Sequence, residues 1–159
     1  MHANLLDEIA ERLAKATGPD PIIDALVKLA FRPPPACVAY EDIAEIELLP
    51  KEEKVRFTLK RIHPELGKPY HGDWHTSVAE PVTSSVDAAI GLICSTLGSA
   101  WGRRLAWDGG AAHVELVGYG GLGCYTASAS TEPLALLRAF MTAWAQQKTP
   151  GVSVPGAFS

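Results

Sequence analysis

Two glycine-rich turns in the second half of the chain constrain its fold more strongly than any other feature. They span Asp108–Gly110 and Gly118–Gly123, and segments of alternating apolar and polar residues flank both of them. Such alternation is the pattern of a half-buried β-strand, and Asp-Gly between two such segments indicates a tight β-hairpin. Residues 103–129 are therefore predicted to form a three-stranded antiparallel sheet.

An amphipathic helix is predicted on each side of this sheet in the sequence. The first covers about residues 85–97, where Ser84 and Asp87 have the spacing of a capping box. The second begins after the capping residue Thr131. Its apolar stripe consists of Leu134, Leu137, Met141 and Trp144. Residues 83–148 are thus predicted to form a sandwich of helix, three-stranded sheet and helix.

The first half of the chain predicts a pair of helices within residues 1–35. An acidic amphipathic helix ends before Gly18, and a second helix opens with Pro21 after the capping residue Asp20. The three prolines at positions 33–35 cannot continue this helix and indicate a stiff extended linker.

Residues 36–82 predict a charged β-hairpin followed by an irregular loop. The clearest strand has alternating apolar residues at Val55, Phe57 and Leu59. Residues 43–49 fit either a strand or one turn-rich helix, and a strand there would complete a hairpin over residues 43–62. Residues 63–82 show no periodicity, and the tail 149–159 has no pattern and is expected to be flexible. The predicted fold class is α+β.

The composition indicates a globular protein with a sizeable core. Hydrophobic residues make up 47% of the 159 residues and charged residues 20%, which excludes a disordered chain. The net charge of −4 lacks the basic excess of nucleic-acid-binding proteins, so nucleic acid is not expected as the main partner. Cys37, Cys94 and Cys124 are widely spaced and form no CxxC or CxxH pair, so we expect buried thiols in a reducing compartment.

The sequence shows no sign of export or of a membrane span. Acidic residues occupy the place where a signal peptide would carry basic ones, and no apolar run approaches membrane-spanning length. We therefore expect a cytoplasmic protein without membrane contact and without a cofactor.

Four segments carry the packing and turn features of the second half, namely TSSVDAAIGL, WGRRLAWDGG, GYGGLGCYTASAS and TEPLALLRAFMTAW. From about Thr83 to Gln147 they resemble the phage ABA sandwich domain family of bacteriophages and prophages. The N-terminal helices resemble the short leader of such proteins, whereas residues 36–70 have no counterpart. The resemblance implies a phage or prophage origin, a layered α/β sandwich and a bacterial host cytoplasm as location. It brings no catalytic or binding residues with it.

The densest polar cluster contains His71, Asp73 and His75. In an extended backbone these alternating residues would point the same way, and two imidazoles with a carboxylate can hold a catalytic metal. A further ligand would have to come from His63 or His113 elsewhere in the fold. A solvated loop is the simpler interpretation of the cluster.

Other catalytic patterns are weak, and no catalytic residue is assigned. Gly118, Gly120 and Gly123 match the letters of GxGxxG, but a predicted strand follows them where a dinucleotide site has a helix. Turn glycines are therefore favoured over a phosphate-binding loop.

Two groups of residues are the candidates for partner binding. The first is the pair Arg56 and Lys60 on the predicted hairpin. The second lies beside the turn at Asp108 and consists of Trp101, Arg103, Arg104 and Trp107. Aromatic and arginine side chains are enriched at protein interfaces, although core packing is the commoner place for tryptophan.

These observations predict a non-enzymatic accessory protein of a phage or prophage that binds a macromolecule. A host defence component, or a second copy of the chain in a homo-oligomer, is the expected kind of partner. A metal-dependent enzyme that uses His71, Asp73 and His75 is the alternative. A structural component of the phage particle is a third interpretation.

Overall fold

The computed structural model describes residues 2–32, 43–76 and 80–148. The chain folds as two units. The first lies within Met1–Ile9 and Pro21–Glu80, and the second within Ala10–Asp20 and Pro81–Ser159. Four helices and two antiparallel sheets among the described residues confirm the predicted α+β class.

Helices α1 (His2–Lys15) and α2 (Pro21–Phe31) occur where the two N-terminal helices were predicted. The apolar stripe of α1 is buried and consists of Leu5, Ile9 and Leu13. Proline opens α2, because its fixed φ suits the first helical position and its missing N–H would have no partner there. Helix α2 is buried on nearly all sides, including Asp24. The predicted proline linker lies outside the described residues.

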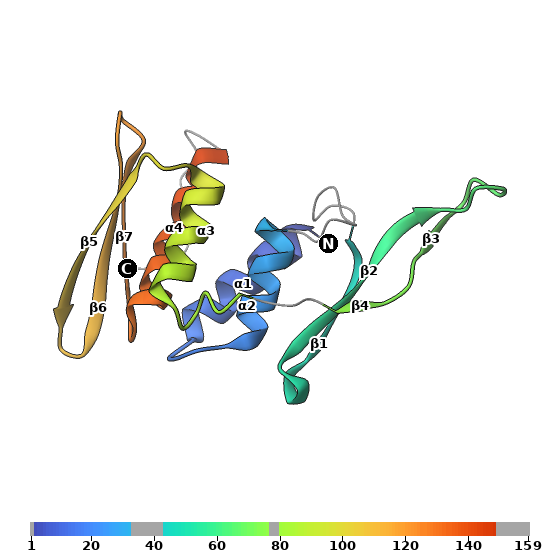
Figure 1. Ribbon diagram of the computed structural model, residues 1–159, viewed down its shortest axis with the longest axis horizontal. Helices are drawn as coiled ribbons and strands as arrows, with labels where there is room; N and C mark the ends of the chain where they lie inside the picture. The colour runs from blue at the N-terminus through green and yellow to red at the C-terminus, as the bar shows by residue number, and fades with distance from the viewer. Residues whose placement is uncertain (1, 33–42, 77–79, 149–159) are drawn as a thin grey trace. The chain divides into compact units, whose positions relative to one another are not determined.

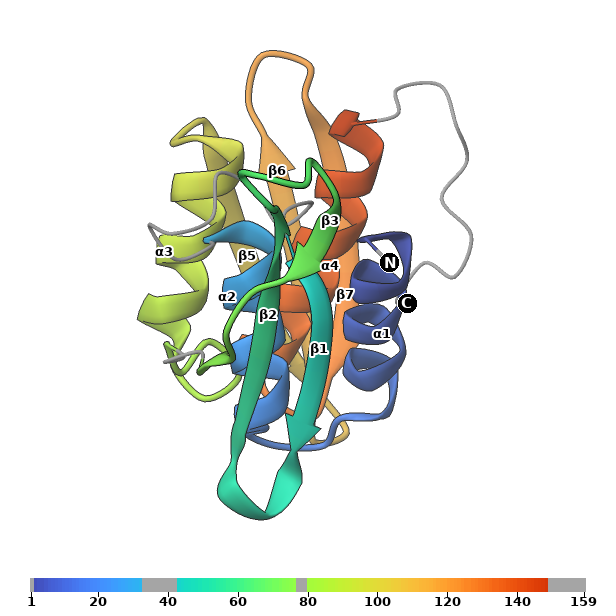
Figure 2. The ribbon, with the colours of Figure 1, turned by 90° about the vertical axis from the view of Figure 1, so that its right-hand side faces the viewer.

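The first unit contains a four-stranded antiparallel sheet around β2 (Lys54–Ile62). Strand β1 (Ile43–Leu49) pairs with one edge of β2, and the short 3₁₀ turn Pro50–Glu52 connects the two strands. Strands β3 (Pro69–His71) and β4 (His75–Thr76) pair with its other edge. Figure 2 shows β1 and β2 side by side with the turn that connects them. The predicted hairpin is therefore present, and residues 43–49 form a strand.

The core of this unit lies between β2 and α2. Val55, Phe57 and Leu59 are at most 1% exposed and occupy the face of β2 that packs against this helix. The expectation of an irregular loop over residues 63–82 was wrong for β3 and β4. These strands are too short to show a period in the sequence, and they form because β2 offers them an edge.

The second unit is a sandwich of one helical layer and one sheet. Its elements in chain order are α3 (Val86–Leu97), β5 (Trp101–Asp108), β6 (Ala111–Gly118), β7 (Gly123–Ala129) and α4 (Glu132–Lys148). The strands form an antiparallel meander in the order β5-β6-β7. Helix α4 packs on β6 and β7, α3 packs beside α4, and both lie on the same side of the sheet (Figure 1). The predicted order of helix, sheet and helix is thus confirmed.

The caps of these two helices follow from single side chains. Ser85 is the N-cap of α3, and its hydroxyl accepts a hydrogen bond from the Ala88 N–H at 3.2 Å. The predicted capping box at Ser84 was therefore displaced by one residue, because the Ser84 hydroxyl donates to the Pro81 carbonyl instead. The Thr131 hydroxyl accepts from the Leu134 N–H at 3.5 Å, as predicted for α4.

Helix α4 forms most of the core of the second unit. Its fully buried residues are Leu134, Ala135, Leu136, Leu137, Ala139, Phe140 and Ala143. They occupy more than one face of the helix, so the buried surface is wider than the predicted stripe. Trp144, expected in the core, is only half-buried.

A single guanidinium connects three segments of this unit. Arg138 of α4 donates from Nε and Nη2 to the Leu13 carbonyl at 2.9 and 2.5 Å, and from Nη1 to the Ser128 carbonyl at 2.6 Å. Leu13 lies in the last turn of α1, where carbonyl groups have no partner within the helix. Burial lowers the pKa of the Arg138 guanidinium from its usual range, yet an arginine remains charged at neutral pH. Arg138 therefore caps α1 and ties it to β7.

Candidate functional site

The candidate residues lie on two surfaces, one in each unit. Arg56, Lys60, His71 and His75 belong to the sheet of the first unit, and Asp73 lies between its strands β3 and β4. The aromatic and basic group belongs entirely to β5 of the second unit. We call residues 60–71, which comprise the end of β2, the turn and β3, the ribbon. We call the outer side of Trp101–Asp108 the β5 edge.

Arg56 is engaged within its own sheet. Its guanidinium forms an ion pair with Glu47 of the neighbouring strand β1. It also lies over the ring of Trp74, with 4.7 Å between Cζ and the ring centroid. Cross-strand ion pairs and cation–π contacts of this kind stabilise a sheet. The structure thus gives Arg56 a role in the sheet, whereas Lys60 is exposed and lies opposite His71 on β3.

The predicted metal ligands do not share one face. His71 lies opposite Lys60, and an unbroken register would place His75 opposite Arg56. His75 instead lies opposite Phe57, because one extra residue between β3 and β4 forms a bulge. The bulge turns His75 to the buried face of β2, where its ring centroid is 5.5 Å from that of Phe57.

His71 has a different neighbour. Its Nδ1 lies 3.3 Å from Oε1 of Glu45. Within residues 2–32, 43–76 and 80–148, no group of three or more His, Cys, Asp and Glu side chains is placed to hold a metal ion. The metal site of His71, Asp73 and His75 was predicted because these side chains would point the same way. His71 and His75 do not share a face, and the site stays a prediction. Elemental analysis of purified protein tests it directly.

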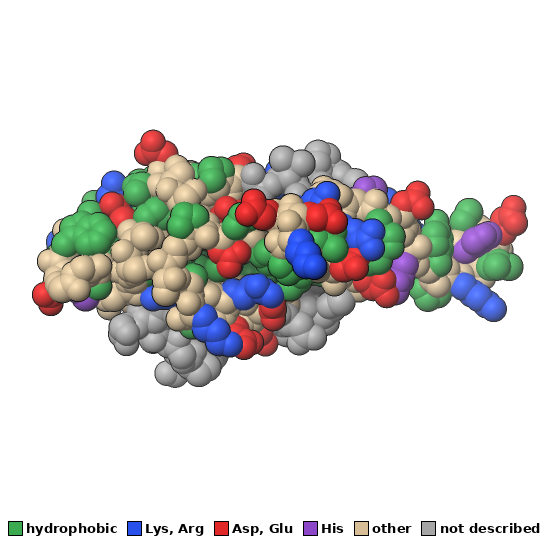
Figure 3. Space-filling view, turned by 90° about the horizontal axis from the view of Figure 1, so that it is seen from below, with side chains coloured by type: hydrophobic (Ala, Val, Ile, Leu, Met, Phe, Trp, Pro, Cys, Tyr) green, Lys and Arg blue, Asp and Glu red, His purple; other side chains and the backbone are tan. Residues whose placement is uncertain are grey.

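The ribbon carries an exposed apolar end that the sequence did not indicate. Ile62, Leu66 and Tyr70 are 73%, 66% and 47% exposed. The turn between them is held by His63, whose Nδ1 accepts from the N–H groups of Glu65 and Leu66 at 3.2 Å. Figure 3 shows hydrophobic, histidine and charged side chains together at this end of the β2–β3 region. In the sequence, the apolar residues Ile62 and Tyr70 on either side of a turn are the signal that could have indicated this exposed end.

The β5 edge has an open backbone. Strand β5 is the first strand of its sheet, and no described strand pairs with its outer side. The Tyr119 N–H donates a hydrogen bond to the Ala100 carbonyl at 2.9 Å. The next pair along the ladder, Trp101 and Gly118, therefore exchanges no backbone hydrogen bonds.

Hydrogen-bonded and non-hydrogen-bonded pairs alternate along an antiparallel ladder. Arg103, Leu105 and Trp107 therefore belong to non-hydrogen-bonded pairs, as Trp101 does. Their backbone N–H and C=O groups point away from β6. Leu105 and Trp107 are also large apolar side chains that are 38% and 58% exposed. Open backbone groups and exposed apolar side chains thus coincide on the same residues.

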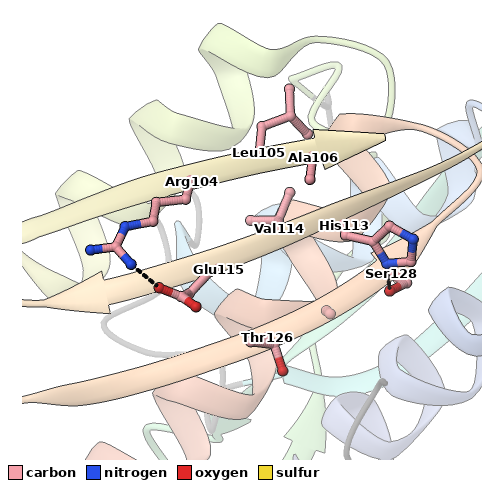
Figure 4. Close-up of a pocket in the computed structure, with 9 residues that line it drawn as sticks. Arg104, Leu105, Ala106, His113, Val114, Glu115, Thr126 and Ser128 are labelled. Atoms are coloured by element: carbon pink, nitrogen blue, oxygen red, sulfur yellow. Dashed lines mark hydrogen bonds and ion pairs between the residues drawn. The ribbon is translucent and has the colours of Figure 1, made fainter. Parts of the chain in front are cut away.

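The two arginines of β5 are paired within the second unit. Arg103 Nη1 lies 2.8 Å from Oε1 of Glu132. Figure 4 shows the second pair, in which Arg104 Nη1 lies 3.0 Å from Oε1 of Glu115. Uncompensated charges on an edge strand usually deter pairing with another strand. Because each guanidinium here has a neighbouring carboxylate, the charges do not close the β5 edge.

The two tryptophans of β5 differ in their surroundings. Trp101 packs over Gly118, where an added Cβ would lie 2.9 Å from Cη2 of the ring. Its ring centroid is 5.9 Å from that of Tyr125 on β7. Trp101 therefore contributes to packing, while the more exposed Trp107 is available to a partner.

Strands β7 and β1 carry features at their edges that the β5 edge lacks. The Ser128 carbonyl of β7 accepts a hydrogen bond from Arg138. The ladder of β1 has a register shift between Ile43 and Glu45, and acidic side chains follow it. Capping, bulges and charges are the usual means by which proteins protect an edge. The long β5 edge shows no bulge in its register with β6.

The face of the second sheet that α4 leaves uncovered forms an open pocket of mixed polar and apolar lining, which sequence reasoning missed. Figure 4 shows Arg104, His113, Glu115, Thr126 and Ser128 along it. Arg104 pairs with Glu115, and His113 Nδ1 lies 2.5 Å from Ser128 Oγ. A serine beside a histidine needs an oxyanion hole and an orienting group to become a nucleophile. The pocket follows from the register of three strands, which no sequence motif reveals.

The cysteines differ from the expectation of buried thiols. Cys94 and Cys124 are both exposed, so this prediction was wrong for them, and Cys37 lies outside the described residues. The pKa of the Cys124 thiol is raised above its usual range by desolvation and by the neighbouring Glu115 carboxylate. Both effects disfavour the thiolate.

We expect Glu115→Gln to accelerate the alkylation of Cys124 by iodoacetamide at about pH 8, because the thiolate is the reactive form and the Glu115 carboxylate disfavours it. Peptide-resolved mass spectrometry of the native protein measures the rates at Cys124 and at Cys94. Cys94 is the internal reference, and its rate should not change. An unchanged rate at Cys124 would contradict the effect of Glu115 on this thiol.

Comparisons with known proteins identify no relative of the chain. No family model, no curated protein and no solved structure matches it. No helix in the described part of the chain has the length and hydropathy of a membrane span. The resemblance to the phage ABA sandwich domain therefore stays an expectation.

Proposed function

We propose that this protein is a non-enzymatic binding module that takes up an extended segment of a protein partner along the β5 edge. The observation that carries the proposal is the coincidence of open backbone groups and exposed apolar side chains at Leu105 and Trp107. An added strand would pair with the backbone groups, and the side chains would give specificity. Tryptophan is also a frequent energetic centre of interfaces.

The positions of His71 and His75 weaken the alternative of a metal-dependent enzyme. The two imidazoles lie on different faces of their sheet, whereas the predicted metal site needs them on one face. The resemblance described above would make this module an accessory protein of a phage or prophage, with a host defence component as one class of target.

Site-specific photocrosslinking in cells that naturally produce the protein tests this function. Benzoylphenylalanine at position 107 should form an adduct with a protein that lies along the β5 edge. The same probe at Thr126, which lies on the opposite face of the sheet, should not form this adduct.

The matched control is Leu105→Pro in the chain that carries the probe at position 107. Because the Leu105 N–H points away from β6, proline should remove a donor to the partner and leave the sheet intact. The adduct should then disappear while the circular dichroism spectrum is retained. A position-107 adduct that persists in this variant, or the absence of any such adduct, would refute binding at the β5 edge.

A further inference from the structure

Strand β5 can pair with the β5 strand of a second copy of this chain. We infer that the occupant of the β5 edge is a second copy of this chain, whose β5 runs antiparallel to the first about a two-fold axis at Ala106. The inference rests on the proposed function and adds the identity and register of the partner. Pairing of this kind would join two three-stranded sheets into one continuous sheet.

Along β5, residues whose backbone groups point outward alternate with residues whose backbone groups point toward β6. This alternation limits the registers that a two-fold pair of β5 strands can adopt. In a two-fold pair, the outward-pointing residues of one strand must lie opposite outward-pointing residues of the other. Arg103, Leu105 and Trp107 point outward, so the axis must pass through a residue position and not between two residues. A small number of centres along β5 remains.

Charge selects among these centres. An axis at Arg103 or at Arg104 would set two guanidinium groups directly opposite each other, which is unfavourable. An axis at Leu105 would set Arg104 opposite Ala106 and leave its charge without a new partner. An axis at Ala106 sets Arg104 opposite Asp108 of the second copy, which is an attractive pair.

The same register also buries the exposed apolar side chains. It places Leu105 of each copy opposite Trp107 of the other, as a hydrogen-bonded pair on the face that α4 covers further along the sheet. At the axis, Ala106 would meet its own copy as a non-hydrogen-bonded pair, where the strands are closest and a small side chain fits. The two exposed side chains and the two opposite charges are thus matched by one arrangement.

Disulfide trapping tests the register. In a chain with Cys37, Cys94 and Cys124 replaced by serine, Ala106→Cys should form a covalent dimer under mild oxidation. The two Cα atoms would be about 4.5 Å apart, which a disulfide can bridge. Leu105→Cys should react far more slowly, because its copies would lie on a diagonal of about 7 Å or more. Faster trapping by Leu105→Cys would overturn the assigned axis.

Sedimentation of the full chain tests the partner. The wild type should show a concentration-dependent dimer, and Leu105→Pro should weaken it by about tenfold or more, since each copy loses a hydrogen-bond donor. A wild type that stays monomeric up to about 1 mM would overturn the inference. If the probe at position 107 then captured a different protein, the proposed function would stand without the dimer. A monomeric wild type without any adduct would refute both.

Discussion

Arg138→Met should lower the free energy of unfolding by about 2–4 kcal/mol. Hydrogen bonds to a charged group contribute about 1.5–3 kcal/mol each, and the half-buried guanidinium retains only part of their sum because solvent screens it. The guanidinium donates to carbonyls of Leu13 and Ser128, and it lies at the C-terminal end of α1, where a positive charge is favourable. Methionine retains the apolar stem of the side chain, so the loss reports on the guanidinium. Urea unfolding followed by circular dichroism measures the change.

Arg138→Lys is the matched control for this substitution. Lysine restores the charge but lacks the planar fork that reaches several carbonyls at once, so an intermediate stability is expected. Hydrogen exchange should show faster exchange in the last turn of α1 for Arg138→Met than for Arg138→Lys. An unfolding midpoint of Arg138→Met equal to that of the wild type would show that the guanidinium does not hold these segments together.

Phe140→Ala should be the most destabilising single truncation in the second unit, with a loss of about 3–5 kcal/mol. Phe140 is 0% exposed and is among the largest fully buried side chains. Its removal deletes apolar contacts and leaves a cavity that close-packed neighbours cannot fill completely. Urea unfolding measures the loss of stability, and hydrogen exchange in β6 and β7 locates it.

Phe140→Leu separates the loss of volume from a change of surroundings. This substitution keeps most of the apolar volume and should cost about 1.5 kcal/mol or less. A cost of Phe140→Ala no larger than that of Phe140→Leu would contradict the placement of this ring in the core. Both variants leave the residues of the β5 edge unchanged.

Local signals in the chain were sufficient to predict most of the elements. Pro21 after Asp20, Thr131 before Glu132 and the Asp108 turn each act within a few residues of the backbone. Helix caps and tight turns depend on such neighbours alone, so their sequence patterns can be recognised without knowledge of the fold. The failure at Ser84 was of the same local kind, because two adjacent serines could both serve as a cap.

The surfaces could be predicted only in part. Trp101, Arg103, Arg104 and Trp107 were selected as a group, and all of them lie on β5. The sequence could not show that Trp101 packs over Gly118 or that each arginine has a carboxylate beside it. These contacts join residues on different strands, and their distances depend on the register.

The pattern of the chain thus specifies where helices, strands and turns occur, because periodicity and caps act over a few residues. Which side chains meet, and which edge stays open, follows from pairing between distant segments. The bulge that separates His71 from His75 arises from how β3 and β4 pair with β2. In the same way, the open backbone at Leu105 follows from the position of β5 at the edge of its sheet. Long-range pairing sets these features, because a strand satisfies its hydrogen bonds on another strand and not within itself.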